Sequence, residues 1–369
     1  MKKLVKVAII GGFLGSGKTT CILQLGKRLM AELGLRIAII TNDQGDTLVD
    51  TKWVGKSGFS VAEVLQGCFC CKFPDFLKSI KGLLEKANPD LILAEPVGSC
   101  ADLQATVYEP LKKFYEREFA LSPFIVLVDG RKLLDVHRRL NLLSPSLGAN
   151  FFLFISQIKE GEVLALNKID LLSKEELEEA KTLLRKLNVK AQIIPISAKE
   201  GMGMEELVKA VLGWHQDSHI LTNFDYEAYE RAELELGWLD GSGLIESERP
   251  FEVKSLVNGI LMGIANCAKE KGGEIAHIKL FFETEDGSTK VSLTAIENDA
   301  IMEGMPPSYA NKGIIILNAR VKLSPESLRK CVEMVLAKTI SEHYVRILNL
   351  NLRAFSPRPP KPYYRSSEV

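Results

Sequence analysis

Short apolar runs alternate with longer amphipathic segments through the first half of the chain. Residues 4–10 form an apolar run that predicts a buried strand, and residues 18–33 have the periodicity of a helix. Strands that alternate with helices of this length indicate an α/β fold with a mainly parallel sheet and helices on both faces. The other expected strands are 36–41, 90–94, 123–128, 162–166 and 191–196, and the other expected helices are 75–87, 99–115, 130–139, 174–187 and 203–214.

The pattern changes after residue 216, where we expect the first domain (1–216) to end. Residues 217–250 are polar and acidic, and they predict a linker that leads into a first strand. The helix and strand patterns over 251–355 indicate a smaller α+β domain of the ferredoxin-like kind. The segment 356–369 is rich in proline, which favours an extended tail. The expected elements beyond residue 216 are strands at 234–246, 274–283, 289–296, 313–322 and 344–350, and helices at 252–270 and 324–339.

Composition and charge narrow the expected partners. The 369 residues include 47 lysines and arginines against 47 aspartates and glutamates, so no long-range attraction to nucleic acid is expected. No apolar run approaches the roughly 20 residues that a bilayer requires, so no membrane partner is expected. Three of the seven cysteines lie within four positions, which is typical of metal or redox chemistry in a cytoplasmic protein.

A glycine-rich segment carries the strongest chemical signal. Residues 12–19 fit the phosphate-loop pattern G-x-x-x-x-G-K-[ST], between an expected strand and an expected helix. The glycines allow backbone N–H groups to surround an anion, and the helix directs its positive end at the same anion. Lys18 can reach the β- and γ-phosphates, and the Thr19 hydroxyl can hold Mg²⁺. The expected nucleotide contacts here are Gly12, Gly15, Ser16, Gly17, Lys18, Thr19 and Thr20.

Two motifs that follow later strands indicate guanine. The segment 167–170 reads Asn-Lys-Ile-Asp, and its carboxylate can accept hydrogen bonds from the guanine ring N–H and exocyclic amine. Taken alone, this segment could instead cap a helix. The segment 197–199 reads Ser-Ala-Lys, where a backbone N–H can meet the guanine oxygen. Ligands of open α/β sheets gather at the carboxyl ends of strands, which favours the functional interpretation. The expected base contacts are Asn167, Lys168, Asp170, Ser197, Ala198 and Lys199.

Residues 95–98, which read Glu-Pro-Val-Gly, follow the strand 90–94. Glu95 stands where phosphate-loop enzymes carry the acid that holds Mg²⁺, and the Gly98 N–H can meet the γ-phosphate. The alternative is a plain turn in which Ser99 caps the next helix.

Residues 67–71, Gly-Cys-Phe-Cys-Cys, place Cys68, Cys70 and Cys71 on one short segment. Three soft donors suit Zn²⁺, Co²⁺, Ni²⁺ or Cu⁺, with a fourth ligand from elsewhere or from water. Buried packing and a redox role are the alternatives. The remaining cysteines, Cys21, Cys100, Cys267 and Cys331, are expected to pack in the core, although Cys100 is also close in sequence to Gly98.

These motifs together resemble the CobW/HypB/UreG family of GTPases, and the CobW-like branch most closely. The phosphate loop, the Gly-Cys-x-Cys-Cys segment, the Glu-x-x-Gly segment and the Asn-Lys-x-Asp segment all match over residues 1 to about 215. The family's first switch segment reads Asn-Glu-Phe-Gly-Glu, whereas residues 42–46 read Asn-Asp-Gln-Gly-Asp. The resemblance implies that Asp43 is a catalytic residue and a ligand of Mg²⁺ or a transition metal, and that Asp46 is a transition-metal ligand. With them, Lys18 and Glu95 are the expected catalytic residues.

The resemblance implies an enzyme that hydrolyses GTP with Mg²⁺ and delivers a metal to a client protein. The expected metal at the cysteines is Zn²⁺ or Co²⁺, with Ni²⁺ as a further candidate. The expected partners are GTP, a client metalloprotein or corrinoid protein, and a second copy of the chain in a homodimer. The branch's name also suggests a cobalamin pathway. The alternatives are a metal-free GTP switch for a cobalamin- or corrinoid-dependent enzyme and a small-molecule kinase, which the guanine motif disfavours.

Overall fold

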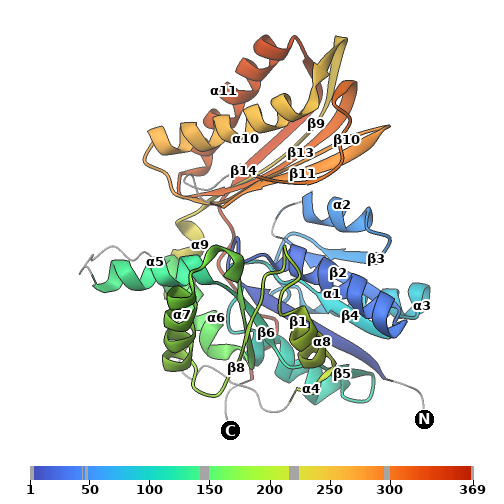
Figure 1. Ribbon diagram of the computed structural model, residues 1–369, viewed down its shortest axis with the longest axis vertical. Coiled ribbons are helices and arrows are strands. Elements are labelled where there is room, and N and C mark those ends of the chain that lie inside the picture. Colours follow the sequence, from blue (N-terminus) through green and yellow to red (C-terminus); the bar gives the residue numbers. More distant parts are fainter. Residues whose placement is uncertain are drawn as a thin grey trace. The chain divides into compact units, whose positions relative to one another are not determined.

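The computed structural model divides the chain into two compact units (Figure 1). Unit 1 comprises Met1–Gln44, Val54–Ala232 and Pro359–Val369, and unit 2 comprises Gly45–Trp53 and Glu233–Arg358. The chain therefore passes between the units more than once, whereas the sequence predicted one change of domain after residue 216. The structure describes residues 4–43, 45, 49–141, 149–215, 224–294 and 300–366.

Unit 1 is built on a parallel sheet, which confirms the predicted α/β fold. The strand order is β3-β2-β4-β1-β6-β7-β8, and β5 pairs with β1 outside this path. Helices flank the sheet, and the central strands are buried along most of their length, so their sequences are continuous apolar runs rather than alternating patterns. The strands are β1 Val5–Gly12, β2 Ile37–Asn42, β3 Ser60–Val64, β4 Leu91–Ala94, β5 Phe119–Leu121, β6 Ile125–Asp129, β7 Val163–Asn167 and β8 Gln192–Pro195.

The helices of unit 1 follow local capping signals in several places. Helix α1, Lys18–Leu33, is bounded by Gly17 and Gly34, which have φ of 94° and 63° and so occupy the left-handed region that favours glycine. Helix α7, Lys174–Leu187, begins with a capping box between Ser173 and Glu176. The other helices are α3 Phe73–Ala87, α4 Glu109–Tyr115, α5 Gly130–Asn141, α6 Ala149–Glu160, α8 Met204–Leu212, α9 Tyr226–Leu234, whose last residues belong to unit 2, and the 3₁₀ turn Ile169–Leu171.

The continuous helix expected over 99–115 is wrong. Residues 99–102 are not helical, and a π-helix, Gln104–Tyr108, precedes α4. Pro110 lies in the first turn of α4 and has no N–H to donate, which interrupts the regular hydrogen-bond ladder at this point. Across the described part of the chain, no helix is long and apolar enough to cross a membrane.

Unit 2 is an antiparallel sheet with two long helices, which confirms the predicted additional α+β domain. The strand order is β12-β11-β10-β13-β9-β14. Strand β13 lies between β9 and β10, which α10 connects, so the arrangement is the expected split βαβ. Strand β12 was not expected from the sequence. The elements are β9 Gly237–Glu252, α10 Val253–Glu270, β10 Ile275–Thr284, β11 Gly287–Leu293, β12 Ile301–Gly304, β13 Tyr309–Val321, α11 Pro325–His343 and β14 Arg346–Phe355.

A disulfide joins the two helices of unit 2. Cys267 on α10 and Cys331 on α11 are both buried, as expected, but they are bonded to each other rather than only packed in the core. The sequence could not pair them, because they are separated by 64 residues and share no motif.

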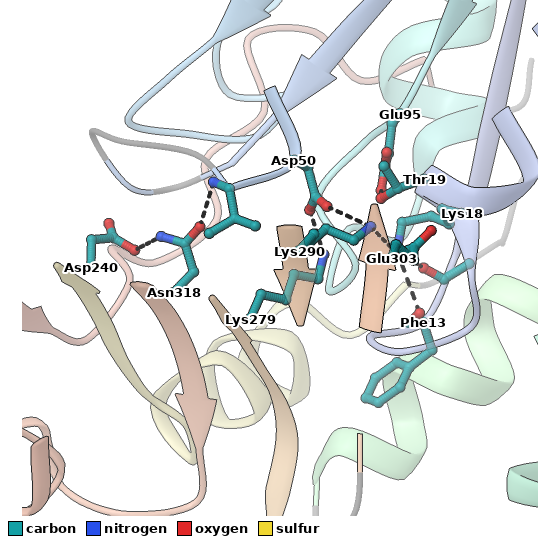
Figure 2. A network of polar contacts seen from close by, with 12 residues as sticks. Phe13, Lys18, Thr19, Asp50, Glu95, Asp240, Lys279, Lys290, Glu303 and Asn318 are labelled. Carbon is teal, nitrogen blue, oxygen red and sulfur yellow. Dashed lines mark hydrogen bonds and ion pairs between the residues drawn. The ribbon is translucent and has the colours of Figure 1, made fainter. Parts of the chain in front are cut away.

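Unit 2 also takes in the segment Gly45–Trp53, which begins within the switch segment 42–46. This segment enters α2, Val49–Gly55, and the Val49 side chain packs against Phe281 and Ile316 of the sheet. The Val49 N–H donates to Asn318 Oδ1 at 2.9 Å, and Asn318 Nδ2 donates to Asp240 Oδ1 at 2.8 Å (Figure 2). Residues 49–53 are therefore held as part of the antiparallel domain.

Charged groups of unit 2 hold the same segment. Asp50 is paired with Lys279, and its second oxygen lies 3.9 Å from Lys290 (Figure 2). Lys290 is also paired with Glu303 at 2.7 Å, and the Trp53 ring lies beneath its ammonium. Because Lys290 is almost completely buried, the two carboxylates compensate a charge that would otherwise be costly to bury.

Candidate nucleotide and metal sites

The phosphate loop connects β1 to α1 and has the form that its sequence predicts. Gly12 has φ of 134°, and a Cβ there would lie 2.4 Å from the Leu127 carbonyl, so only glycine fits. The Lys18 ammonium donates to the carbonyls of Gly12 at 2.9 Å and Phe13 at 3.4 Å, which holds it over the loop (Figure 2). Among the described residues, the buried Ser16 Oγ has no hydrogen-bond partner. A buried hydroxyl without a partner is available to hydrogen-bond a phosphate oxygen bound in the loop.

Thr19 and Glu95 form the candidate Mg²⁺ site. The Thr19 hydroxyl donates to Glu95 Oε1 at 3.0 Å, and both side chains are buried (Figure 2). A hydroxyl and a carboxylate side by side beside a phosphate loop are the hard oxygen donors that Mg²⁺ prefers. A Cβ at Gly98 would lie 3.0 Å from the Leu14 nitrogen, so its backbone lies against the phosphate loop. The alternative role for Ser99 as a helix cap is wrong, since no helix begins there and its buried Oγ has no partner in the described chain.

The three expected nucleotide motifs lie together. Asn167 Nδ2 donates to the Ser16 carbonyl at 2.7 Å, and Asn167 Oδ1 accepts the Ala198 N–H at 2.9 Å. One side chain therefore joins the phosphate loop, the Asn-Lys-Ile-Asp segment and the Ser-Ala-Lys segment. Lys168 is paired with Asp129 at 2.5 Å, at the end of β6.

The remaining base-motif residues differ in exposure. Asp170 is exposed and lies in the first turn of the short 3₁₀ helix, so the segment does begin a helical turn, although its N-cap is Lys168 and no side chain makes a capping hydrogen bond. Ser197 is buried, and its hydroxyl accepts the Glu200 N–H at 3.2 Å, while Lys199 is exposed. A carboxylate that is still exposed at the strand ends is available to a ligand. Thr20 is half-buried in the first turn of α1.

The cysteine segment brings three thiols together between β3 and α3. The sulfur atoms of Cys68, Cys70 and Cys71 all lie within 4.8 Å of one another, with Cys68 and Cys70 2.9 Å apart. Hydrogen bonds from the thiols of Cys100, Cys70 and Cys71 lower the pKa of Cys68, and burial opposes them. Hydrogen bonding to Cys68 and burial raise the pKa of Cys71 to about 12. A lowered thiol pKa favours metal binding, because only the thiolate is a strong ligand.

The family follows from comparison with known proteins. The sequence profile of the CobW/HypB/UreG nucleotide-binding domain matches residues 6–195, which is just over half of the chain. The chain belongs to this family. The match includes β1 through β8, the phosphate loop, the cysteine segment and the Asn-Lys-Ile-Asp segment, and it confirms the predicted family.

Individual relatives align with this chain over different shares of its length. The zinc-regulated GTPase metalloprotein activator 1 of Dictyostelium discoideum is 24% identical over 302 residues, which are 70% of this chain and 60% of that protein. The zinc chaperone YeiR of Escherichia coli (strain K12) is 32% identical over 139 residues, 36% of this chain and 40% of that protein. This chain thus spans about half the length of these curated relatives. The crystal structure of Zn(II)-bound YjiA GTPase from E. coli aligns over 90% of this chain and 99% of its own, with 15% identity and a TM-score of 0.37.

Asn42, at the start of the family's switch segment, is a positioning residue that sequence reasoning missed. Its Oδ1 accepts the N–H of Phe69 at 3.1 Å and of Val97 at 3.4 Å. Its Nδ2 donates to the carbonyls of Val64 at 2.9 Å and Gly67 at 2.7 Å. A single buried amide thus joins the switch, the cysteine segment and the Glu-Pro-Val-Gly segment. Its place in the family's switch motif was the available signal.

Of the two acidic residues expected in the switch, the structure describes Asp43 but not Asp46. The Asp43 N–H donates to the Val64 carbonyl at 3.2 Å, and its own carbonyl accepts the Gly67 N–H at 3.5 Å. Asp43 is therefore beside the cysteine segment, although its carboxylate is not within the thiol cluster. The expected ligand Asp46 lies outside the described residues.

The proline-rich segment is not simply an extended tail, because residues 359–366 belong to unit 1 and cover the cysteine segment. The Lys361 N–H donates to Cys71 Sγ at 3.3 Å, and the Tyr363 N–H donates to the Cys70 carbonyl at 2.8 Å. Further along, Arg365 is paired with the buried Asp102 at 2.8 Å. N–H donors to sulfur stabilise a thiolate, so this segment contributes to the electrostatics of the cluster.

Proposed function

We propose that the protein is a GTP-hydrolysing metallochaperone that couples nucleotide turnover to delivery of a transition metal, foremost Zn²⁺, to a client metalloprotein. The observation that carries this proposal is the cluster of Cys68, Cys70 and Cys71, which Asn42 joins to the nucleotide side of the sheet. The names of the relatives, which include zinc chaperones, support zinc ahead of Co²⁺ and Ni²⁺. A metal-free switch leaves the thiol cluster without a role.

We propose the following nucleotide roles from the positions of the side chains around the phosphate loop. Lys18 contacts the β- and γ-phosphates, Thr19 and Glu95 hold Mg²⁺, and the Gly98 N–H contacts the γ-phosphate. An Mg²⁺ ion held by Thr19 and Glu95 would neutralise charge that develops on the phosphates. Asn167 positions the base motif, in which Asp170 accepts hydrogen bonds from guanine. Asp43 is hydrogen-bonded through its backbone to Val64 and Gly67, beside the cysteine segment, so its carboxylate is proposed as a ligand of Mg²⁺ or of the transported metal.

We propose that the switch segment 42–46 couples GTP hydrolysis to metal affinity. Switch segments are ordered by the γ-phosphate and Mg²⁺ and relax after hydrolysis. Asn42 hydrogen-bonds Phe69 and Val97 at once, so a rearrangement of the switch alters the backbone beside the thiols. Linkage then requires that metal change GTP affinity by the same factor by which GTP changes metal affinity. A tenfold effect needs only about 1.4 kcal/mol of coupling.

We expect tight metal binding in the GTP state and weaker binding in the GDP state. The measurement is a competition titration of the full chain with Zn²⁺ and with Co²⁺ in the presence of a GTP analogue or GDP. Replacing Cys68, Cys70 and Cys71 together with alanine should abolish metal binding and leave GTP binding intact. Equal metal affinity in the two nucleotide states would exclude the delivery mechanism, even if the metal site were real.

Guanine specificity should depend on Asp170. Asp170→Asn replaces an acceptor with a mixed donor and acceptor, so binding of GTP should weaken by about 1–3 kcal/mol and xanthosine triphosphate should be favoured. Fluorescent-nucleotide competition measures both affinities. Asp135→Asn, which changes an exposed carboxylate on α5, is the matched control and should bind GTP normally. Equal wild-type affinity for ATP and GTP would refute this assignment.

A further inference from the structure

A fourth cysteine is held in a fixed position beside the thiol cluster. Cys100 is only 2% exposed, and its N–H donates to the Val97 carbonyl at 2.9 Å. Its own carbonyl accepts a hydrogen bond from Gln157 Nε2 at 2.7 Å, and the same nitrogen donates to the Gly98 carbonyl at 3.0 Å. Gln157 is itself buried, so the backbone on both sides of Cys100 is held by a side chain of α6.

The Cys100 side chain is directed at the cluster. Its thiol lies close enough to interact with the side chains of both Cys68 and Cys70, although its sulfur is not within 4.8 Å of all three of the others. Cys70 Sγ in turn lies 2.9 Å from Cys68 Sγ and 3.9 Å from Cys71 Sγ. Four thiols from two separate segments therefore form one connected group. Zn–S bonds of about 2.3 Å place the sulfur ligands of a tetrahedral ion roughly 3.8 Å apart. The separation of Cys70 and Cys71 already matches this spacing, whereas Cys68 and Cys70 would move apart around the ion.

We propose that Cys100 is the fourth ligand of the transition metal and completes a four-thiolate site with Cys68, Cys70 and Cys71. The inference rests on the metal site of the proposed function and adds to it the ligand that the cysteine segment lacks. Four thiolates in a tetrahedron favour Zn²⁺ and leave no open position for water or substrate, so the metal is held as cargo rather than used in catalysis.

Cys100 lies on a different segment of the chain from the other three thiols. It lies on the segment after β4, which also contains Glu95 and Gly98, whereas the other three thiols lie on the segment after β3. A metal bound by all four would cross-link the cysteine segment to the segment proposed to contact Mg²⁺ and the γ-phosphate. Withdrawal of one thiol would open the site for transfer of the ion.

The test is the number of sulfur ligands on zinc. The full chain is loaded with one equivalent of Zn²⁺ and examined by X-ray absorption at the zinc edge, and affinity is measured with a chromophoric chelator. Wild type should show four sulfur ligands. Cys100→Ala and the isosteric Cys100→Ser should each show three sulfurs with a lighter fourth ligand, and should bind Zn²⁺ at least tenfold more weakly.

Cys21→Ala is the matched control, because Cys21 is another fully buried thiol of unit 1 that lies outside the cluster. It should retain four sulfurs and wild-type affinity. Three sulfurs in wild type, or an unchanged sulfur count in both Cys100 variants, would overturn the role of Cys100 while leaving the three-cysteine site in place. Retention of zinc by the variant that lacks Cys68, Cys70 and Cys71 would instead refute the metal site, and with it both proposals.

Discussion

Replacement of Lys18 with alanine should reduce GTP hydrolysis by at least 10²–10³-fold, because we propose that this buried ammonium contacts the transferred phosphate and stabilises charge that develops in the transition state. The Lys18 ammonium is held over the phosphate loop by the Gly12 and Phe13 carbonyls. Phosphate release under single-turnover conditions, at saturating GTP and Mg²⁺, measures the loss.

Lys27→Ala serves as the control for this experiment, since Lys27 lies on the same helix but is exposed to solvent. Its hydrolysis rate should equal that of wild type. A Lys18→Ala rate within tenfold of wild type would show that the loop does not bind the nucleotide in the proposed way.

Replacement of Asp240 with alanine should destabilise unit 2 by about 3–5 kcal/mol. Asp240 Oδ1 accepts from Arg320 at 3.0 Å and from Asn318 at 2.8 Å, and the Arg320 side chain is fully buried beneath the Trp238 ring. Removing the carboxylate takes an anionic partner away from a buried guanidinium. The measurement is hydrogen exchange of the amides of β9 and β13 as a function of urea concentration, which reports on this sheet alone.

An exposed ion pair on the same two strands provides the comparison. Glu246 on β9 is paired with Lys312 on β13 at 3.0 Å, and the lysine side chain is 63% exposed. Glu246→Ala should therefore change stability by no more than about 1 kcal/mol. Equal losses for the two variants would show that burial of the Asp240–Arg320 pair does not determine its contribution.

The motifs that a single segment encodes could be predicted from the sequence. The phosphate loop, the base motif and Glu95 each follow a buried strand, and parallel strands bring their carboxyl ends to one edge, so these groups were expected to lie together. Asn167, which joins two of them, was expected as a site residue because it belongs to such a motif.

Contacts between distant segments could not be predicted in the same way. Asn42 joins three segments through hydrogen bonds that the hydrophobic periodicity of the sequence does not predict. The hydrogen bond from Lys361 to Cys71 likewise joins residues 290 positions apart. The inclusion of Gly45–Trp53 in unit 2 depends on packing of Val49 against strands synthesised more than 200 residues later. In each case local propensity does not predict the contact, because the free energy that stabilises it comes from tertiary interactions.

The distance in sequence between the cysteine segment and its cover has a consequence for biosynthesis. Chains emerge from the ribosome N-terminal end first, at about 5–20 residues per second. The four thiols at 68–100 therefore leave the ribosome long before residues 359–366, which lie against Cys70 and Cys71. For an interval of roughly 15–60 seconds the nascent thiols lack this cover. Cover of the thiols by residues 359–366 therefore begins only when synthesis of the chain is nearly complete.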